Sequence, residues 1–163
     1  MGALIAGDDV TLDSQQLVNS GQLIARRQLT LTGDTLEDTG GQAQANAISA
    51  TATDDITLTD SQWTARESLT LDAGRNLTLA RATHSDTLTH GTRTTVGEGT
   101  VLRTTGETGQ VNITAGQDMT VRGSDIINDG TGDTTLAAGG ALTVTHVMDD
   151  TRRHDPDLSL IHI

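Results

Sequence analysis

The 163-residue chain contains no cysteine, phenylalanine, tyrosine or lysine, and it has one proline and one tryptophan. Without cysteine, disulfides and cysteine-ligated zinc or iron–sulfur sites are excluded. Aromatic side chains normally fill much of a core, so the core here must be built from Leu, Ile, Val, Ala and Met. No apolar run approaches the roughly 18 residues that a membrane-spanning helix needs, and we expect a chain that is not membrane-embedded.

Threonine and glycine are abundant instead, with 30 Thr and 18 Gly. Thr favours strands and Gly weakens helices, so the composition argues against a helical bundle. The formal net charge is −12, from 22 acidic residues against 10 arginines. Such an acidic surface does not suit nucleic acid or anionic lipid, and we predict no nucleic-acid partner. It keeps the protein soluble, or it could serve calcium or a basic partner.

The organising feature is a repeated apolar–Thr–apolar strand. Its two apolar side chains share one face and Thr points the other way, so one face is buried and the other is wet. In the N-terminal part the strand and a following turn repeat every 19 residues, as in 17–22 and 36–41. In the C-terminal part, strands eight residues apart flank an Ala-Gly turn, where Gly supplies backbone angles that other residues resist. The predicted turn glycines are Gly74, Gly116 and Gly139.

A repeat near 20 residues with several short strands is typical of a stacked solenoid. We predict an all-β fold, a right-handed parallel β-helix of about seven coils around an aliphatic column. The residues predicted to point inward are Leu29, Leu31, Ile56, Leu58, Leu69, Leu71, Leu77, Leu79, Val111, Ile113, Met119, Val121, Leu142 and Val144.

The repeat also divides the chain. Coils are predicted over 1–79 and 109–147, with an irregular loop or hairpin excursion over 80–108, where few apolar residues are in phase. The Ala-rich stretch 42–53 is predicted to close a coil or to form an irregular one. Residues 148–157 are polar and are predicted to be a further excursion or a fraying end.

The last six residues, Leu-Ser-Leu-Ile-His-Ile at 158–163, break with the preceding composition. A common transposon-end sequencing adapter encodes the same hexapeptide in one frame, so we treat it as a non-native tail and exclude it from fold reasoning. The alternative is a native strand or tail. On the first interpretation, the natural protein continues beyond residue 157.

Two runs resemble repeats of the filamentous haemagglutinins. Residues 17–25, Leu-Val-Asn-Ser-Gly-Gln-Leu-Ile-Ala, look like the first repeat type. Residues 109–144 resemble the second, haemagglutinin-repeat type, with Gly-Ser at 123–124 followed by an apolar pair. The resemblance covers most of 1–150 and is weakest at 80–108. It implies a right-handed parallel β-helix within a long exoprotein of two-partner secretion, either an adhesin or a contact-dependent growth-inhibition protein.

The resemblance also implies a function and partners. Such exoproteins cross the outer membrane unfolded through a dedicated transporter and form a rod at the bacterial surface. The expected role is a shaft segment without catalysis, cofactor or metal, with a receptor on a host or neighbouring cell as a further partner. One alternative is a segment that itself binds glycan or protein as an adhesin. Another is a polysaccharide lyase or hydrolase, which needs a cleft with clustered carboxylates, Arg and aromatics.

A few residues could carry chemistry. His84 and His90 would share a face of an extended segment and could bind a metal with Asp86, although exposed loop histidines are the preferred interpretation. The pairs Asp8-Asp9, Asp54-Asp55 and Asp149-Asp150 are assigned to turns or solvent, because neighbours on a strand point to opposite faces.

Three other features could bind a ligand, but each also has a structural interpretation. Gly-Thr-Gly-Asp at 130–133 comes nearest to a calcium-binding β-roll repeat, but it occurs once and lacks the spacing. The pairs Arg26-Arg27 and Arg152-Arg153 could contact acidic glycans. Trp63 could stack on a sugar or form part of the wall.

Overall fold

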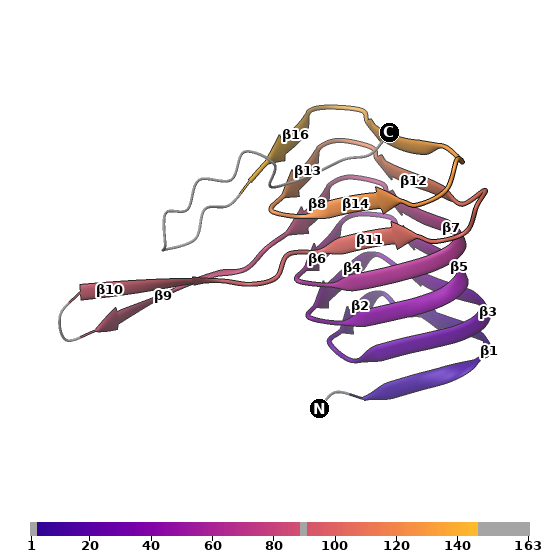
Figure 1. Cartoon of the computed structure of the whole chain (residues 1–163), viewed down its shortest axis with the longest axis horizontal. Coiled ribbons are helices and arrows are strands. Elements are labelled where there is room, and N and C mark those ends of the chain that lie inside the picture. Colours follow the sequence, from indigo (N-terminus) through magenta and orange to yellow (C-terminus); the bar gives the residue numbers. More distant parts are fainter. Residues whose placement is uncertain (1–2, 89–90, 147–163) are drawn as a thin grey trace.

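The computed structural model describes residues 3–88 and 91–146, which form sixteen strands and no helix. Fourteen of the strands wind into six coils stacked along one axis, and the other two form a hairpin that leaves the stack (Figure 1). The front strands run from left to right as the coil rises from β1 to β16, so the β-helix is right-handed (Figure 1). The fold class predicted from the repeat is confirmed.

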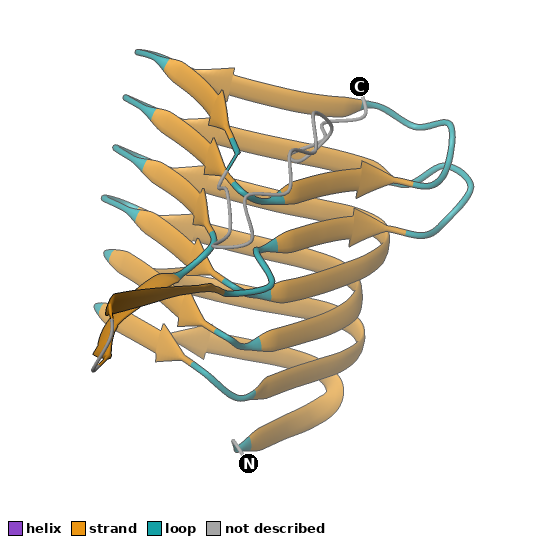
Figure 2. Ribbon diagram, turned by 60° about the vertical axis from the view of Figure 1, so that its left-hand side comes forward, coloured by secondary structure: helices purple, strands orange, loops and turns teal. Residues whose placement is uncertain are grey.

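Two parallel sheets form the walls (Figure 2). The eight-stranded sheet contains β1 (Leu4–Asp13), β3 (Gln22–Gly33), β5 (Gln42–Ala52), β7 (Gln62–Ala73), β11 (Val101–Thr104), β12 (Gln110–Ala115), β14 (Asp125–Asn128) and β15 (Thr134–Ala138). The six-stranded sheet contains β2 (Gln16–Asn19), β4 (Thr35–Thr39), β6 (Ile56–Thr59), β8 (Leu77–Ala80), β13 (Met119–Arg122) and β16 (Leu142–Thr145), one strand per coil. The hairpin is β9 (Thr83–Leu88) and β10 (Gly91–Val96).

The four lower coils each begin with a long strand that bends at a β-bulge. The pairing register shifts between Gly7 and Asp9 in β1 and between Ala45 and Ala47 in β5. Because a bulge re-aims a strand, one long strand can line two sides of the coil. In the upper coils the bulge becomes a loop: β11 pairs with the first part of β7 and β12 with the second.

The core is a column of aliphatic side chains in register from coil to coil. Each buried Leu, Ile or Val contributes about 1.5–3 kcal/mol relative to an exposed one. Twelve of the fourteen residues predicted to point inward are buried: Leu29, Leu31, Ile56, Leu58, Leu69, Leu71, Leu77, Leu79, Val111, Ile113, Met119 and Val121.

The other two, Leu142 and Val144, are 46% and 42% exposed, so the prediction that they are buried was wrong. They do lie in the predicted inward rows, because they pair with Met119 and Val121 of the six-stranded sheet. Leu142 and Val144 are exposed because β16 is the last described strand of its sheet. It pairs with β13 below, and no described strand lies above it to cover these two side chains.

The predicted turn glycines stack on one another, but for a different reason from the one expected. Gly74, Gly116 and Gly139 are not in the left-handed region of backbone conformation. A Cβ on Gly116 would instead overlap the carbonyl oxygen of Gly74, and one on Gly139 would overlap that of Gly116. Glycine is required here because backbones of successive coils approach closely.

The predicted excursion over 80–108 is shorter in the structure. The hairpin spans residues 83–96, and the wall resumes with β11 rather than at residue 109. The Ala-rich stretch 42–53 is not irregular, since it forms β5. The hairpin and the upper loops use residues without adding coils, which explains six coils where about seven were predicted. Residues 148–157 and 158–163 lie outside the described residues.

Candidate interaction surfaces

One corner of the β-helix has an unusual backbone. It joins each strand of the six-stranded sheet to the next strand of the eight-stranded sheet. All described residues with positive φ lie at this corner: Gly40 at 69°, Asp60 at 51°, Gly99 at 88° and Gly123 at 56°. Asp60 is the only one with a side chain, and Asp is among the few such residues that tolerate this region. A left-handed residue therefore turns the chain at this corner in successive coils.

The β9–β10 hairpin leaves the rod through this corner (Figure 1). It is an antiparallel ribbon with Thr83 paired to Val96 and Leu88 paired to Gly91. It projects away from the coils as an arm, which we call the hairpin arm (residues 82–98). Gly99 then resumes the corner conformation, so the arm is inserted between the end of β8 and the corner residue of the next coil.

Asp60 holds the base of the hairpin arm. Its Oδ1 accepts hydrogen bonds from the backbone N–H of Ala82, at 3.3 Å, and of Gly99, at 2.8 Å. On the other side, Arg81 Nη2 donates to the carbonyl of Glu98 at 2.9 Å, and Arg122 Nη2 donates to the carbonyl of Arg81 at 3.1 Å. Asp60 thus ties both ends of the arm to the coil below, and Arg122 ties the N-terminal end to the coil above.

A groove of about 270 Å³ lies on the wall of the rod, over β3, β5 and β7. A ladder of Gln22, Gln42 and Gln62 lines it together with Ile24 and other residues of these strands. Gln22 Nε2 donates to Gln42 Oε1 at 3.1 Å, while Gln62 Nε2 donates to the carbonyl oxygen of Gly99 at 3.3 Å. An uncharged row of amides can exchange hydrogen bonds with the hydroxyl groups of a ligand.

The loop between β11 and β12 and the loop between β14 and β15 stack on each other at the edge of the rod opposite the hairpin arm (Figure 2). Arg103 and Asp129 form an exposed ion pair beside them, with Nε and Oδ2 2.9 Å apart. The hydrogen bond to Asp129 raises the pKa of Arg103, and the same bond lowers the pKa of Asp129. Because the pKa of Asp129 is lowered by folding, the ion pair stabilises the protein above the pH range in which a free carboxyl titrates. This stabilisation is lost as the pH falls and Asp129 is protonated, and it is small because both side chains are exposed to solvent.

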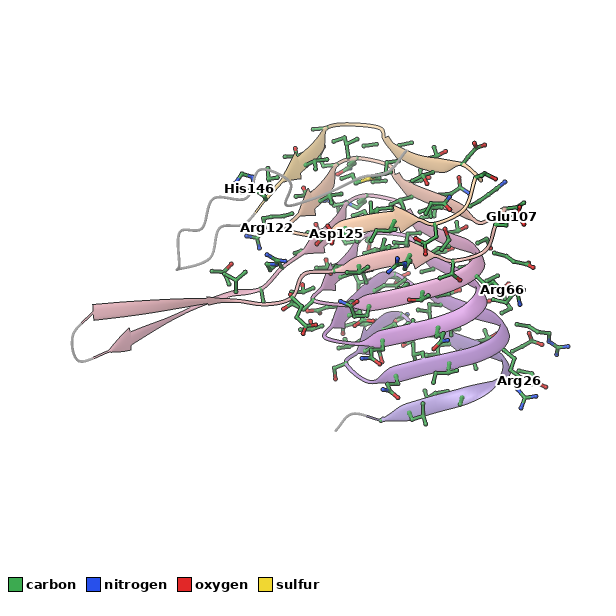
Figure 3. The ribbon with its side chains drawn as sticks, viewed as in Figure 1. Arg26, Arg66, Glu107, Arg122, Asp125 and His146 are labelled. Carbon is green, nitrogen blue, oxygen red and sulfur yellow. The ribbon has the colours of Figure 1, made fainter. Side chains whose placement is uncertain are left out.

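The residues singled out in the sequence do not gather into one site. Arg26, which points outward from the rod in Figure 3, has its Nε 3.4 Å from Asp8 Oδ1. Arg27 Nη2 lies 2.8 Å from Asp9 Oδ2, so both arginines are already paired with carboxylates. Trp63 is 2% exposed, which removes it as a stacking platform for a sugar.

The remaining candidates divide between described and undescribed parts of the chain. Asp55 Oδ1 accepts from the backbone N–H of Asn76 at 3.1 Å, a turn role. Within residues 3–88 and 91–146, no three His, Asp or Glu side chains are placed to hold a metal ion. This finding covers Gly-Thr-Gly-Asp at 130–133 but not the side chains of His84 and Asp86. His90, Asp149-Asp150 and Arg152-Arg153 lie outside the described residues.

Sequence reasoning missed two residues, Asp60 and Asp38. Asp60-Ser61 occupies the corner position that Gly123-Ser124 occupies two coils later, and aligning these dipeptides would have marked Asp60 as a left-handed residue. Leu-Glu-Asp at 36–38 aligns with Ile-Thr-Leu at 56–58, which places Asp38 at an inward position. The signal for Asp38 is therefore in the repeat, although an apolar–Thr–apolar pattern does not detect a polar inward residue.

The comparisons with known proteins give no match, whether to a family model, to a curated protein or to a solved structure. In the part of the chain that the structure describes, no helix has the length and apolarity to cross a membrane.

Proposed function

We propose that the chain is a segment of the β-helical shaft of a large secreted exoprotein at a bacterial surface, serving adhesion or contact-dependent growth inhibition. The observation that carries this proposal is the stacking of coils along one axis by in-register parallel pairing. Each coil extends such a rod by about 4.8 Å without changing its cross-section, so the fold suits a spacer.

The sequence supports the proposal in a second way. Residues 17–25 and 109–144 resemble the two repeat types of filamentous haemagglutinins, which are exoproteins of two-partner secretion. The proposed partner for export is therefore an outer-membrane transporter of that system. A chain without cysteine forms no disulfide that would obstruct passage of the unfolded polypeptide.

The hairpin arm and the amide-lined groove favour a second candidate, in which the segment itself is adhesive. An arm that projects from a rod, and a row of Gln side chains on its wall, are both placed to contact a protein or a glycan. The receptor would then lie on a host or neighbouring cell.

A binding experiment separates the two candidates. The purified chain would be applied to glycan arrays and to cells, beside a variant with residues 82–98 deleted and a Gln42→Ala variant. A passive shaft gives no binding above background with any of the three proteins. Binding by the natural chain that is lost in either variant contradicts the shaft proposal and identifies the adhesive surface.

The genome decides between adhesion and growth inhibition. A variable toxin domain downstream in the reading frame, followed by a small immunity gene, is the expected arrangement for growth inhibition. An uninterrupted rod without such a pair of features favours an adhesin.

A further inference from the structure

Asn19 and Asp38 are polar residues at inward positions of the column. The parallel ladder pairs Asn19 with Asp38 and Asp38 with Leu58. In the coils above, the same row continues through Leu79, Val121 and Val144. Asp38 is 2% exposed, although the row is otherwise aliphatic from Leu58 upward. The two lowest coils therefore depart from the repeat at one inward row.

The Asp38 carboxylate accepts four hydrogen bonds. Oδ1 accepts from the backbone N–H of Gly41, at 2.8 Å, and from Ser61 Oγ, at 3.0 Å. Oδ2 accepts from Trp63 Nε1, at 2.9 Å, and from Asn19 Nδ2, at 3.0 Å. We call Asn19, Asp38, Ser61 and Trp63 the Asp38 cluster. It links β2 in the first coil to β7 in the fourth coil.

The buried polar groups of the Asp38 cluster are hydrogen-bonded because these particular coils are stacked on one another. A carboxylate accepts hydrogen bonds, and all four of its partners can donate, so the buried charge is matched by donors. Burying the same carboxylate among aliphatic side chains without donors is strongly destabilising. The indole N–H of Trp63 would lose its acceptor at the same time, because it is also buried.

The next coil along these two rows carries no buried carboxylate. One coil higher, Leu58 and Leu102 take the places of Asp38 and Trp63. Both are apolar and carry no donor or acceptor that a particular neighbouring coil must match. If the first coil paired directly with the third, Asn19 would face Leu58, and Trp63 would lie without an acceptor.

We propose that the Asp38 cluster is a register lock, which makes the lower coils stack in one order and penalises arrangements in which a coil is skipped. Repeats of similar sequence need such a device, because several pairings bury equivalent apolar rows. A single buried polar residue that fixes register is the best-attested role of polar groups in an apolar core.

Engineered cysteine pairs can report the register, because the chain has no cysteine of its own. Val18 and Glu37 are exposed ladder partners, so V18C with E37C reports native stacking. Thr57 lies one coil further along the same row, so V18C with T57C reports a skipped coil. Neighbouring coils are about 4.8 Å apart, and two steps are about 10 Å, which is too far for a disulfide.

The lock is removed by Asn19→Leu, Asp38→Leu and Trp63→Leu together, since Leu58 of β6 and Leu102 of β11 occupy the positions one coil above Asp38 and Trp63. Each cysteine pair would be placed in the natural and the lock-free chain, refolded from denaturant under oxidising conditions, and its cross-linked fraction measured. We expect the V18C/T57C cross-link to rise about tenfold or more in the lock-free chain, equivalent to about 1.4 kcal/mol. The V18C/E37C cross-link should form in both.

An equal V18C/T57C fraction in the natural and lock-free chains would overturn the proposal. If the triple variant does not fold, Asp38→Asn gives the same comparison, because the amide has the same shape but cannot accept from all four donors. A rise in the V18C/T57C fraction with Asp38→Asn supports the lock. An unchanged fraction in that folded variant contradicts it.

Discussion

At the residue scale, glycine and aspartate shape this rod in ways that composition does not reveal. Gly116 is needed because the carbonyl oxygen of Gly74 occupies the space of a side chain, while Asp60 carries a side chain in a conformation that its neighbours along the corner leave to glycine. Glycine is therefore required for different reasons at different corners. At one corner it allows close approach of two backbones, and at the other it allows a positive φ.

Gly116→Ala should destabilise the chain by about 1–3 kcal/mol, because the added methyl group must displace the backbone of the coil below. Gly7→Ala is the matched control, since its nearest atom would lie at an ordinary 3.5 Å and its φ is not positive. Urea unfolding followed by circular dichroism measures both. Equal midpoints for the two variants would show that the close approach at Gly116 is not a constraint.

Leu71→Asp should prevent folding or cause aggregation, because it places an unpaired charge in the column, where Leu71 is fully buried. Thr70→Asp is the control on the outward face of the same strand. Far-ultraviolet circular dichroism and thermal melting report the result. A Leu71→Asp chain with the spectrum and melting temperature of the natural protein would refute the inward assignment.

At the element scale, strand periodicity predicted the inward rows well and predicted element ends poorly. Apolar–Thr–apolar tripeptides such as 69–71 and 77–79 fall in β7 and β8, because a two-residue alternation fixes which face is buried. The long strands were not predicted, because a bulge interrupts the alternation at their centres. The strand β11 was missed because Val-Leu-Arg-Thr at 101–104 follows an irregular segment and lacks the Thr-centred pattern.

Packing between coils explains another element that periodicity misjudged. The Ala-rich β5 has small inward side chains, and its sequence was predicted to close a coil or to form an irregular one. Ala43 lies beside Trp63 of the next coil in the ladder, and both are buried. A large side chain in one coil thus fills the space that a small one leaves in its neighbour, and single-strand patterns carry no trace of this exchange.

Deleting residues 82–98, so that Arg81 joins Gly99, should leave the six coils intact. Gly99 already has the corner conformation, and the hairpin makes its ladder only with itself. Circular dichroism and melting should change little, within about 1 kcal/mol of the natural stability.

Deletion of 101–104 is the control, because it removes β11 from the wall and should abolish cooperative unfolding. If both deletions unfold the protein, the hairpin arm is part of the folding unit and not an insertion.

At the scale of the whole molecule, length is set by the number of coils and not by the number of residues. A duplicate of residues 101–124 inserted after Ser124 would add one coil, because Val101 and Asp125 already occupy the same ladder position. The rod should lengthen by about 4.8 Å with an unchanged cross-section, as measured by small-angle X-ray scattering. An inserted copy that widens the particle without lengthening it would contradict the stacked arrangement.

The direction of the ladder has a mechanical consequence. The hydrogen bonds between coils run along the rod, while the covalent chain runs around it, so tension along the axis loads the hydrogen bonds of one rung at a time. The backbone ladder joins each coil only to its neighbours, and the load therefore peels the rod from its ends in steps of about twenty residues. Under axial tension such a rod is expected to lengthen by unfolding one coil after another. The force on an attached domain is then limited to the force that detaches a single coil.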